Sequence, residues 1–225
     1  IQQIEAPSFS PSKKYTKALL SALPFEMTGA QKRVSKEIED DLKLNKPMLR
    51  LIQGDVGAGK TLVAGVAACH ALEEGWQVAL MAPTEILAEQ HYLNFKKWFE
   101  PLGLSVSWLS GKQKGKARAA AEQIIKDGSA HLIVGTHALF QENVEFAKLG
   151  LVIIDEQHRF GVNQRLALRN KGLDGMTPHQ LVMTATPIPR TLAMTLYGDL
   201  DVSVIDELPP GRKPIATIHQ FDNRR

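Results

Sequence analysis

The chain has 225 residues and a formal net charge of +3, with 44% hydrophobic and 23% charged residues, which is the balance of an ordinary globular protein. No apolar run approaches the roughly 18 residues that a membrane span needs, and the one cysteine, Cys69, excludes an internal disulfide and a cysteine-rich metal site. We therefore expect a cytosolic protein with no membrane partner, whose mild basicity permits a polyanionic ligand without requiring one.

The chain begins with a polar, proline-bearing segment, and residues 1–14 are expected to form a linker or a loose end. A short helix is expected over 15–23, and an amphipathic helix over 34–44. Seven short apolar segments follow, alternating with helix-prone ones. The expected strands cover 49–52, 76–82, 104–109, 131–135, 151–155, 180–184 and 201–205. The expected helices between them cover 62–72, 85–99 and 117–125.

This alternation predicts an α/β fold of the RecA-like, phosphate-loop type, with a mostly parallel sheet and helices on both faces. In such folds the crossovers are right-handed, and because the strands are parallel their carboxyl ends lie at one edge. Ligands bind beyond that edge. The motifs that carry chemistry in this chain follow strand ends, as this architecture requires.

A glycine-rich turn lies between the first expected strand and its helix. It fits the phosphate-binding pattern G-x-x-x-x-G-K-[ST] with Gly54, Asp55, Val56, Gly57, Ala58, Gly59, Lys60 and Thr61. The glycines let successive backbone N–H groups point at one anion, and the new helix adds its positive end. Lys60 supplies a charge for the β- and γ-phosphates of ATP, and the Thr61 hydroxyl can bind Mg²⁺. The turn therefore predicts an ATP and Mg²⁺ site.

Two adjacent carboxylates end the strand expected over 151–155. Asp155 can hold Mg²⁺, usually through water, and Glu156 can orient and deprotonate the attacking water. Gln157 and His158 follow directly, and a histidine here suits a structural hydrogen bond as well as it suits a role in the reaction. A solvated strand end is the alternative interpretation of the acids.

Four small polar residues are candidates for other parts of this site. Thr28 and Gln31 fit a capping box at the start of a helix, and the Gln31 amide is also able to make a two-point contact with adenine. Thr184 and Thr186 lie at a strand end. They either cap a helix or form a hydroxyl relay, which links the metal end of the site to the ligand that is moved.

Three further turns at strand ends are candidates for contact with a nucleic-acid backbone. They are Pro83, Thr84 and Glu85; Ser110, Gly111 and Lys112; and Gly135, Thr136 and His137. Two of them open an expected helix, where unbonded N–H groups can bind phosphates. The other leads into residues 112–118, which carry four cations. Ordinary α/β turns and solvated charged surfaces have the same appearance, so each turn alone is weak evidence.

In their order along the chain, these motifs resemble motifs Q, I, Ia, Ib, II and III of superfamily 2 helicases. The segments are, in that order, 25–31, 54–61, 83–85, 135–136, 155–158 and 184–186. Residues 155–162, 183–190 and 197–212 are similar in more detail to the bacterial RecG-type family of branched-DNA helicases. The resemblance covers about residues 15–220.

This resemblance implies the first RecA-like motor domain of an ATP-dependent DNA helicase or translocase. Such enzymes act on stalled replication forks and Holliday junctions in DNA repair and recombination, in the bacterial cytoplasm. The resemblance places Phe25 and Thr28 in the nucleotide site and favours adenine contact by Gln31. It assigns Gln157, His158, Thr184 and Thr186 to the coupling of hydrolysis to movement. We expect a monomer.

The resemblance also implies parts of the enzyme that this sequence does not contain. A RecG-type protein carries an N-terminal wedge domain and a second motor domain with motifs IV to VI. We expect residues 15–208 to form the first motor domain and residues 209–225 to begin the linker to the second. No arginine finger is assigned in this chain, because Arg190 is not a convincing substitute.

Two alternative functions stay open at this point. One is a transcription-repair coupling translocase, whose family usually has a second glutamate where Gln157 stands. The other is a nucleotide-gated binding module that never hydrolyses, against which Glu156 beside Asp155 argues. A DNA-stimulated ATPase assay separates the binding module from both enzymes.

Overall fold

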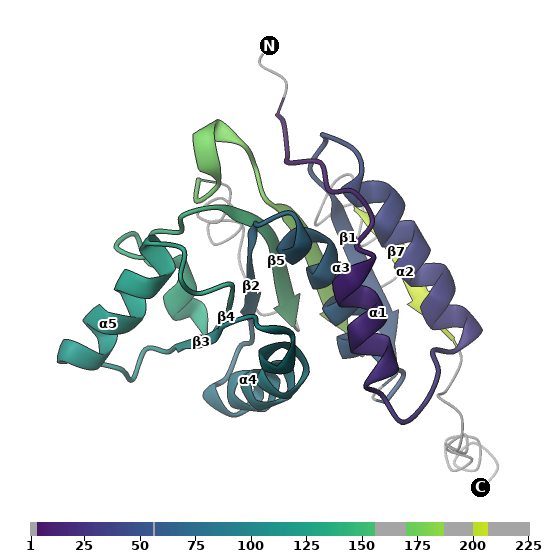
Figure 1. The fold of residues 1–225 in the computed structure, drawn as a ribbon, viewed down its shortest axis with the longest axis horizontal. Coiled ribbons are helices and arrows are strands. Elements are labelled where there is room, and N and C mark those ends of the chain that lie inside the picture. The colour runs from purple at the N-terminus through teal and green to yellow at the C-terminus, as the bar shows by residue number, and fades with distance from the viewer. Residues whose placement is uncertain (1–3, 56, 156–169, 187–199, 207–225) are drawn as a thin grey trace, which may run out of the picture.

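The computed structural model describes residues 4–55, 57–155, 170–186 and 200–206. In this part of the chain seven parallel strands form one sheet, in the order β3-β4-β2-β5-β6-β1-β7 (Figure 1). The strands are β1 (Leu49–Gly54), β2 (Gln77–Met81), β3 (Val106–Leu109), β4 (Leu132–Gly135), β5 (Leu149–Asp155), β6 (His179–Thr184) and β7 (Asp201–Ile205). Each coincides with an expected strand, and the predicted α/β fold is confirmed.

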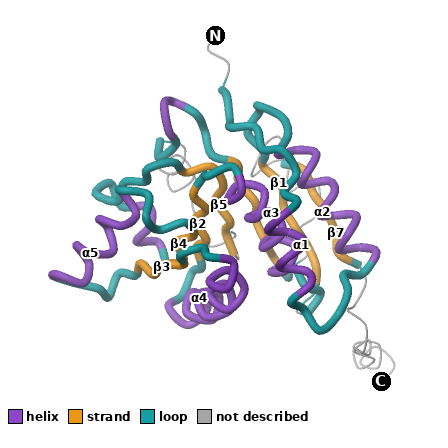
Figure 2. Tube along the Cα trace, in the orientation of Figure 1, coloured by secondary structure: helices purple, strands orange, loops and turns teal. Residues whose placement is uncertain are grey.

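Two helices precede the first strand, and three more alternate with the strands along the chain, as expected (Figure 2). They are α1 (Lys14–Ser21), α2 (Gly29–Leu42), α3 (Lys60–Glu73), α4 (Glu85–Phe99) and α5 (Gly115–Lys126), with 3₁₀ turns η1 (Glu100–Leu102), η2 (His137–Phe140) and η4 (Leu173–Gly175). Helix α2 begins earlier than its apolar pattern indicates, because Thr28 caps it. The turn at Gly135 opens only the 3₁₀ turn η2, which corrects the expectation of a helix there.

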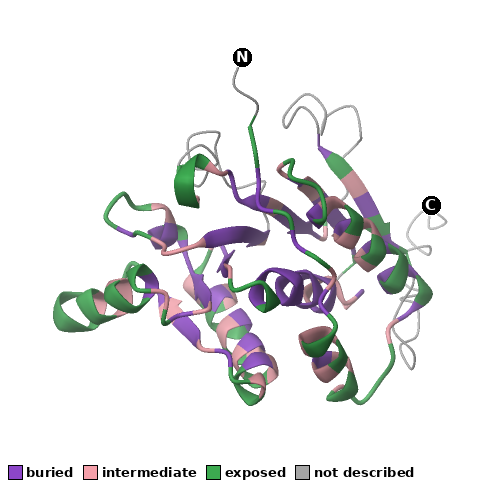
Figure 3. Cartoon of the chain, turned by 45° about the horizontal axis from the view of Figure 1, so that its top comes forward, coloured by how far each residue is buried: buried purple, intermediate pink, exposed green. Residues whose placement is uncertain are grey.

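Both faces of the sheet are covered, so its central strands are almost wholly buried (Figure 3). Side chains alternate along each strand: Val78 and Leu80 of β2 pack into the core formed with α1 to α4, whereas Ala79 and Met81 pack with α5 and η2. Among the described helices, none combines the length and apolarity that a bilayer crossing requires.

The segment before α1 is packed against the domain, in contrast to the loose end that its composition indicated. Phe9 is buried, and its N–H donates to the Leu42 carbonyl at 2.7 Å. Two buried histidines bind the same segment. His70 accepts from the N–H of Ser12 at 2.7 Å, and the Nε2 atom of His179 lies 2.7 Å from the Pro7 carbonyl oxygen. The burial of a few apolar side chains, such as Phe9, therefore fixes the segment on the domain in spite of its mostly polar composition.

These two histidines predict a pH-dependent stability. Burial lowers the pKa of His70 and of His179 below the ordinary value near 6.5, so both stay neutral when the unfolded chain is already protonated. Their contribution is fully present above that value and is lost as the pH falls below it. The free energy of unfolding should fall by up to about 1.4 kcal/mol per pH unit for each histidine.

Urea unfolding between pH 7.5 and pH 5 measures this effect. His179→Gln should flatten the decline, and replacing the exposed His137 in the same way is the control that should leave it unchanged. An equally steep decline in His179→Gln would contradict the assignment.

Candidate nucleotide site and nucleic-acid interface

The glycine-rich turn forms a closed loop between β1 and α3. Gly57 and Gly59 adopt φ angles of 87° and 84°, in the left-handed region that favours glycine. The N–H of Ala58 donates to the Asp55 carbonyl at 3.0 Å, which tightens the turn. A Cβ on Gly59 would lie 1.8 Å from the side-chain nitrogen of Gln31, so a larger residue here would displace the Gln31 amide. Val56 lies outside the described residues.

Lys60 is the first residue of α3, and its side chain folds back over the loop. Its Nζ atom donates to the carbonyl oxygens of Gly54 at 2.6 Å and of Asp55 at 3.1 Å. A phosphate at the N-terminus of α3 would be a stronger partner for this ammonium than neutral carbonyls are. The loop, the helix start and Lys60 therefore fit the phosphates of a nucleotide.

Thr28 and Gln31 connect α2 to this loop. The capping box is present: the N–H of Gln31 donates to the Thr28 hydroxyl at 3.1 Å, and the N–H of Thr28 donates to the Gln31 amide oxygen at 2.9 Å. The Gln31 amide nitrogen also donates to the Ala58 carbonyl at 3.0 Å. An amide has two donors and two acceptor positions, so these hydrogen bonds use one of each, in a residue that is only 1% exposed. Phe25 is 42% exposed, as a ring that stacks on a base must be.

The candidate metal ligands lie on either side of β6. Strand β6 pairs with β1 and with β5, so the ends of β1 and β5 are roughly 10 Å apart, twice the usual strand spacing. Thr61 follows β1 through the loop, and Asp155 ends β5. Thr184 ends β6 between them, and its hydroxyl accepts from the N–H of Thr186 at 3.0 Å. Thr184, one of the two threonines predicted to form a hydroxyl relay, therefore lies on the strand between the two predicted ligands.

The chemistry of these groups fits Mg²⁺. Hydroxyl and carboxylate oxygens are its preferred donors, and in nucleotide sites it keeps several waters and phosphate oxygens. Within the described ranges no three His, Cys, Asp or Glu side chains gather into a set that could hold a metal by themselves. One protein carboxylate with one hydroxyl is consistent with a cation that arrives with a nucleotide.

A residue that the sequence did not indicate contacts the metal-site acid. The Nε2 atom of His91, on α4, lies 2.6 Å from Oδ2 of Asp155, and the two side chains are only 11% and 13% exposed. The two residues are separated by 64 positions and left no signal in the sequence, because the contact depends on how α4 packs over the sheet. The other candidates beside Asp155, namely Glu156, Gln157 and His158, lie outside the described residues.

The three candidate nucleic-acid turns follow three adjacent strands, β3, β4 and β2. Backbone hydrogen bonds join their ends: Ala82 N–H donates to Gly135 at 3.0 Å, and Thr136 N–H donates to Leu109 at 3.3 Å. A Cβ on Gly135 would lie 2.0 Å from the Leu109 carbonyl oxygen, so glycine permits this close approach. The turns at 83–85, 110–112 and 135–137 thus form one continuous edge.

Within these turns the threonine hydroxyls cap helical turns, whereas Lys112 and His137 are exposed to solvent. Thr84 caps α4 by accepting from the N–H of Leu87 at 3.2 Å, and Thr136 caps η2. Arg118 belongs to the structure of the turn, because it donates to the Ser110 carbonyl at 2.9 Å and pairs with Glu122 at 2.7 Å. Of the four cations, the lysines are the candidates for phosphate contact.

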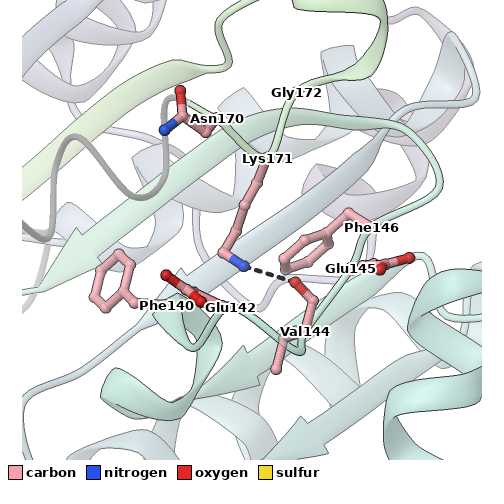
Figure 4. A pocket seen from close by; sticks show the side chains of 8 residues that line it. All are labelled: Phe140, Glu142, Val144, Glu145, Phe146, Asn170, Lys171 and Gly172. Carbon is pink, nitrogen blue, oxygen red and sulfur yellow. Dashed lines mark hydrogen bonds between the residues drawn. The ribbon is translucent and has the colours of Figure 1, made fainter.

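A pocket of about 400 Å³ lies apart from the candidate nucleotide groups. It is lined by Phe140, Glu142, Val144, Glu145, Phe146, Asn170, Lys171 and Gly172 (Figure 4). The Lys171 ammonium donates to the Val144 carbonyl at 2.6 Å, and burial lowers its pKa. Gly172 pairs with Leu149 at the start of β5, roughly 20 Å along the strand from Asp155. This pocket is therefore not part of the candidate site.

The structural hydrogen bonds of Gln31 and its expected contact with adenine can be separated by one variant. Gln31→Ala removes its hydrogen bonds to Thr28 and Ala58, so the free energy of unfolding should fall by about 1–2 kcal/mol even without nucleotide. If the amide also contacts adenine, the preference for ADP over GDP should fall in the same variant. Urea unfolding and competition binding measure the two effects, with the exposed Gln90→Ala as control. Unchanged stability would show that the capping box contributes nothing.

Comparison with known proteins identifies the family. Residues 28–195 match the DEAD/DEAH box helicase family. The chain is 63% identical to the ATP-dependent DNA helicase RecG of Escherichia coli strain K12 and 61% identical to that of Haemophilus influenzae, each over 225 residues. Each alignment covers 100% of this chain but 32% of the relative. The chain thus spans about a third of the length of the curated relatives it matches.

A solved structure gives the same result. RecG bound to a three-way DNA junction superimposes on this chain with a TM-score of 0.81 and 45% identity, over 93% of this chain and 28% of that chain. These matches do not favour the transcription-repair coupling alternative. They include the loop, the strand-end acid and the three candidate nucleic-acid turns described above. The chain therefore belongs to the DEAD/DEAH box helicase family, and within superfamily 2 it is a first motor domain of the RecG type.

Proposed function

We propose that the chain is the ATP-binding motor domain of a branched-DNA helicase or translocase that acts on stalled replication forks and Holliday junctions. One observation carries this proposal: the candidate nucleotide groups and the candidate DNA groups occupy neighbouring halves of one sheet edge. The relatives named ATP-dependent DNA helicase, and the relative bound to a three-way DNA junction, support the same substrates. ATP and Mg²⁺ are the proposed cofactors.

Each residue of the nucleotide half has a proposed role. Lys60 binds the phosphates, with the backbone N–H groups of the loop, and Thr61 and Asp155 hold Mg²⁺. Glu156 orients the attacking water and takes its proton. When bound, the metal nucleotide supplies the phosphoryl group and the charge that neutralises it. Gln31 stays hydrogen-bonded to the loop and senses adenine with its remaining donor and acceptor.

Four residues at the end of β6 and directly after the acid of β5 are proposed to couple hydrolysis to movement. Thr184 and Thr186 lie at the end of β6, beside the strand that carries the acid. Gln157 and His158 follow that acid in the sequence. On the DNA half, the backbone N–H groups at 83–85 and 135–137 and the Lys112 ammonium contact phosphates without reading sequence.

The division of the chain is also part of the proposal. We assign residues 15–208 to the motor domain and residues 209–225 to the beginning of a linker, with a second motor domain and a wedge domain elsewhere in the full-length protein. The second motor domain supplies the arginine that phosphoryl transfer needs on the other side of the γ-phosphate. We propose a monomer in the bacterial cytoplasm, where chromosomal DNA lies.

Separate variants distinguish binding from chemistry. Lys60→Ala should weaken ADP and ATP binding, because the phosphates lose their cation. Glu156→Gln should leave binding intact and lower ATP turnover by at least about 100-fold, because an amide cannot take the proton. Calorimetric titration and steady-state ATPase assays on the full-length protein measure both effects, with the exposed Lys97→Ala as control. Equal loss of affinity in both variants would overturn the two roles, and turnover that DNA never stimulates would favour a binding module.

DNA contact by Lys112 predicts a change in salt dependence. Lys112→Ala should reduce the slope of log affinity against log salt concentration by roughly 0.7–0.9, because one fewer phosphate is neutralised. The loss should be the same for DNA of any sequence. The matched control is Lys126→Ala, at the far end of α5, where the ammonium lies 3.6 Å from Glu145. An unchanged slope in Lys112→Ala would show that this ammonium contacts no DNA phosphate and is only a solvated surface charge.

A further inference from the structure

The boundary between the two halves of the sheet edge lies between β2 and β5. These strands pair directly, with Met81 beside Ile154. Residues 83–85, which belong to the candidate DNA turns, therefore leave the sheet next to Asp155, the proposed metal ligand. Helix α4 starts at Glu85 and carries His91 about 9 Å further along its axis. The contact between His91 and Asp155 thus joins the two halves.

The chemistry of the two groups decides which of them donates the hydrogen bond. An ionised carboxylate only accepts hydrogen bonds, so Nε2 of His91 carries the hydrogen and donates it to Oδ2 of Asp155. The separation of 2.6 Å lies at the short limit for a hydrogen bond between a nitrogen and a carboxylate oxygen. One oxygen of Asp155 is thereby held in place, while no hydrogen bond from another described residue reaches Oδ1, which has the chemistry to bind the water shell of a cation.

Packing holds the imidazole in this orientation. His91 lies against Phe95, one turn further along α4, with ring centroids 6.4 Å apart. Phe95 is fully buried and stacks on Phe99 at 5.6 Å. A ring that is anchored in the core on one side and bonded to a carboxylate on the other has few alternative rotamers. The histidine thus contacts the core through Phe95 and the candidate metal ligand through Asp155.

We propose that His91 is a positioning residue of the ATPase site. It orients Asp155 for Mg²⁺ and ties that carboxylate to α4, so that a shift of α4 on DNA contact at 83–85 changes the geometry of the metal site. The inference rests on the proposed function, specifically on the metal role of Asp155. Hydrogen-bonding partners of metal-binding carboxylates commonly contribute 10- to 100-fold to metal affinity or activity. The same range is expected here.

The test compares ADP binding to the full-length protein in saturating Mg²⁺ and in EDTA. His91→Ala should weaken the apparent affinity for Mg²⁺ in the ADP complex by at least about tenfold, with ADP affinity in EDTA unchanged. His91→Gln should recover much of it, because its amide nitrogen reaches the place of Nε2. His70→Ala is the matched control: His70 is also a buried histidine, but its hydrogen bond is to the backbone N–H of Ser12.

A second measurement tests the link to DNA. The ratio of ATP turnover with a synthetic junction to turnover without it should fall several-fold in His91→Ala and less in His91→Gln. If His91→Ala does not fold, the comparison is made between His91→Gln and His91→Asn, since the shorter asparagine amide does not reach Asp155.

The outcomes separate this inference from the proposed function. If Asp155→Ala abolishes the Mg²⁺ dependence of ADP binding while His91→Ala keeps it, His91 only stabilises the fold and the inference is wrong. If neither variant changes the Mg²⁺ dependence, the metal role of Asp155 itself fails. An unchanged stimulation ratio in His91→Ala, with reduced Mg²⁺ affinity, would overturn the link to DNA.

Discussion

The parallel pairing of all seven described strands is the constraint on which the rest of the structure depends. It brings every carboxyl end to one edge, so a loop after β1, an acid after β5 and turns after β2, β3 and β4 become neighbours although the sequence separates them widely. It also buries both faces of the sheet, which requires helices on each side. The candidate site is therefore a consequence of strand direction rather than of any one motif.

The order of the strands then divides this edge. β5, β6 and β1 carry the acid, the hydroxyl relay and the phosphate loop, whereas β3, β4 and β2 carry the turns assigned to DNA. A motor needs such a division, because a nucleotide and a polyanion must be held close together without competing for the same cations. Lys60 donates hydrogen bonds to the loop carbonyls, and Lys112 lies in the turn after β3, so each half has its own cation.

Several polar side chains in this domain perform two tasks at once. Gln31 caps α2 and holds the phosphate loop through Ala58, so the loop conformation and the stability of the helix depend on one amide. The buried histidines His70 and His179 bind the N-terminal segment to the core. Such groups are hydrogen-bonded because an unpaired buried polar group is costly.

The alternation of apolar runs and the spacing of glycines are local properties of the chain, so they were enough to predict the seven strands, the fold class, the glycine-rich loop with Lys60 and the turns at strand ends. The sequence also indicated the capping box of Thr28 and Gln31, which spans only one helical turn. The tertiary structure alone decided that residues 4–13 pack on the domain, that Gln31 reaches Ala58, that Arg118 supports its own turn, and that His91 binds Asp155. Each of these depends on which side chains the packing of helices on the sheet brings within hydrogen-bonding distance, and no periodicity in the sequence records that distance.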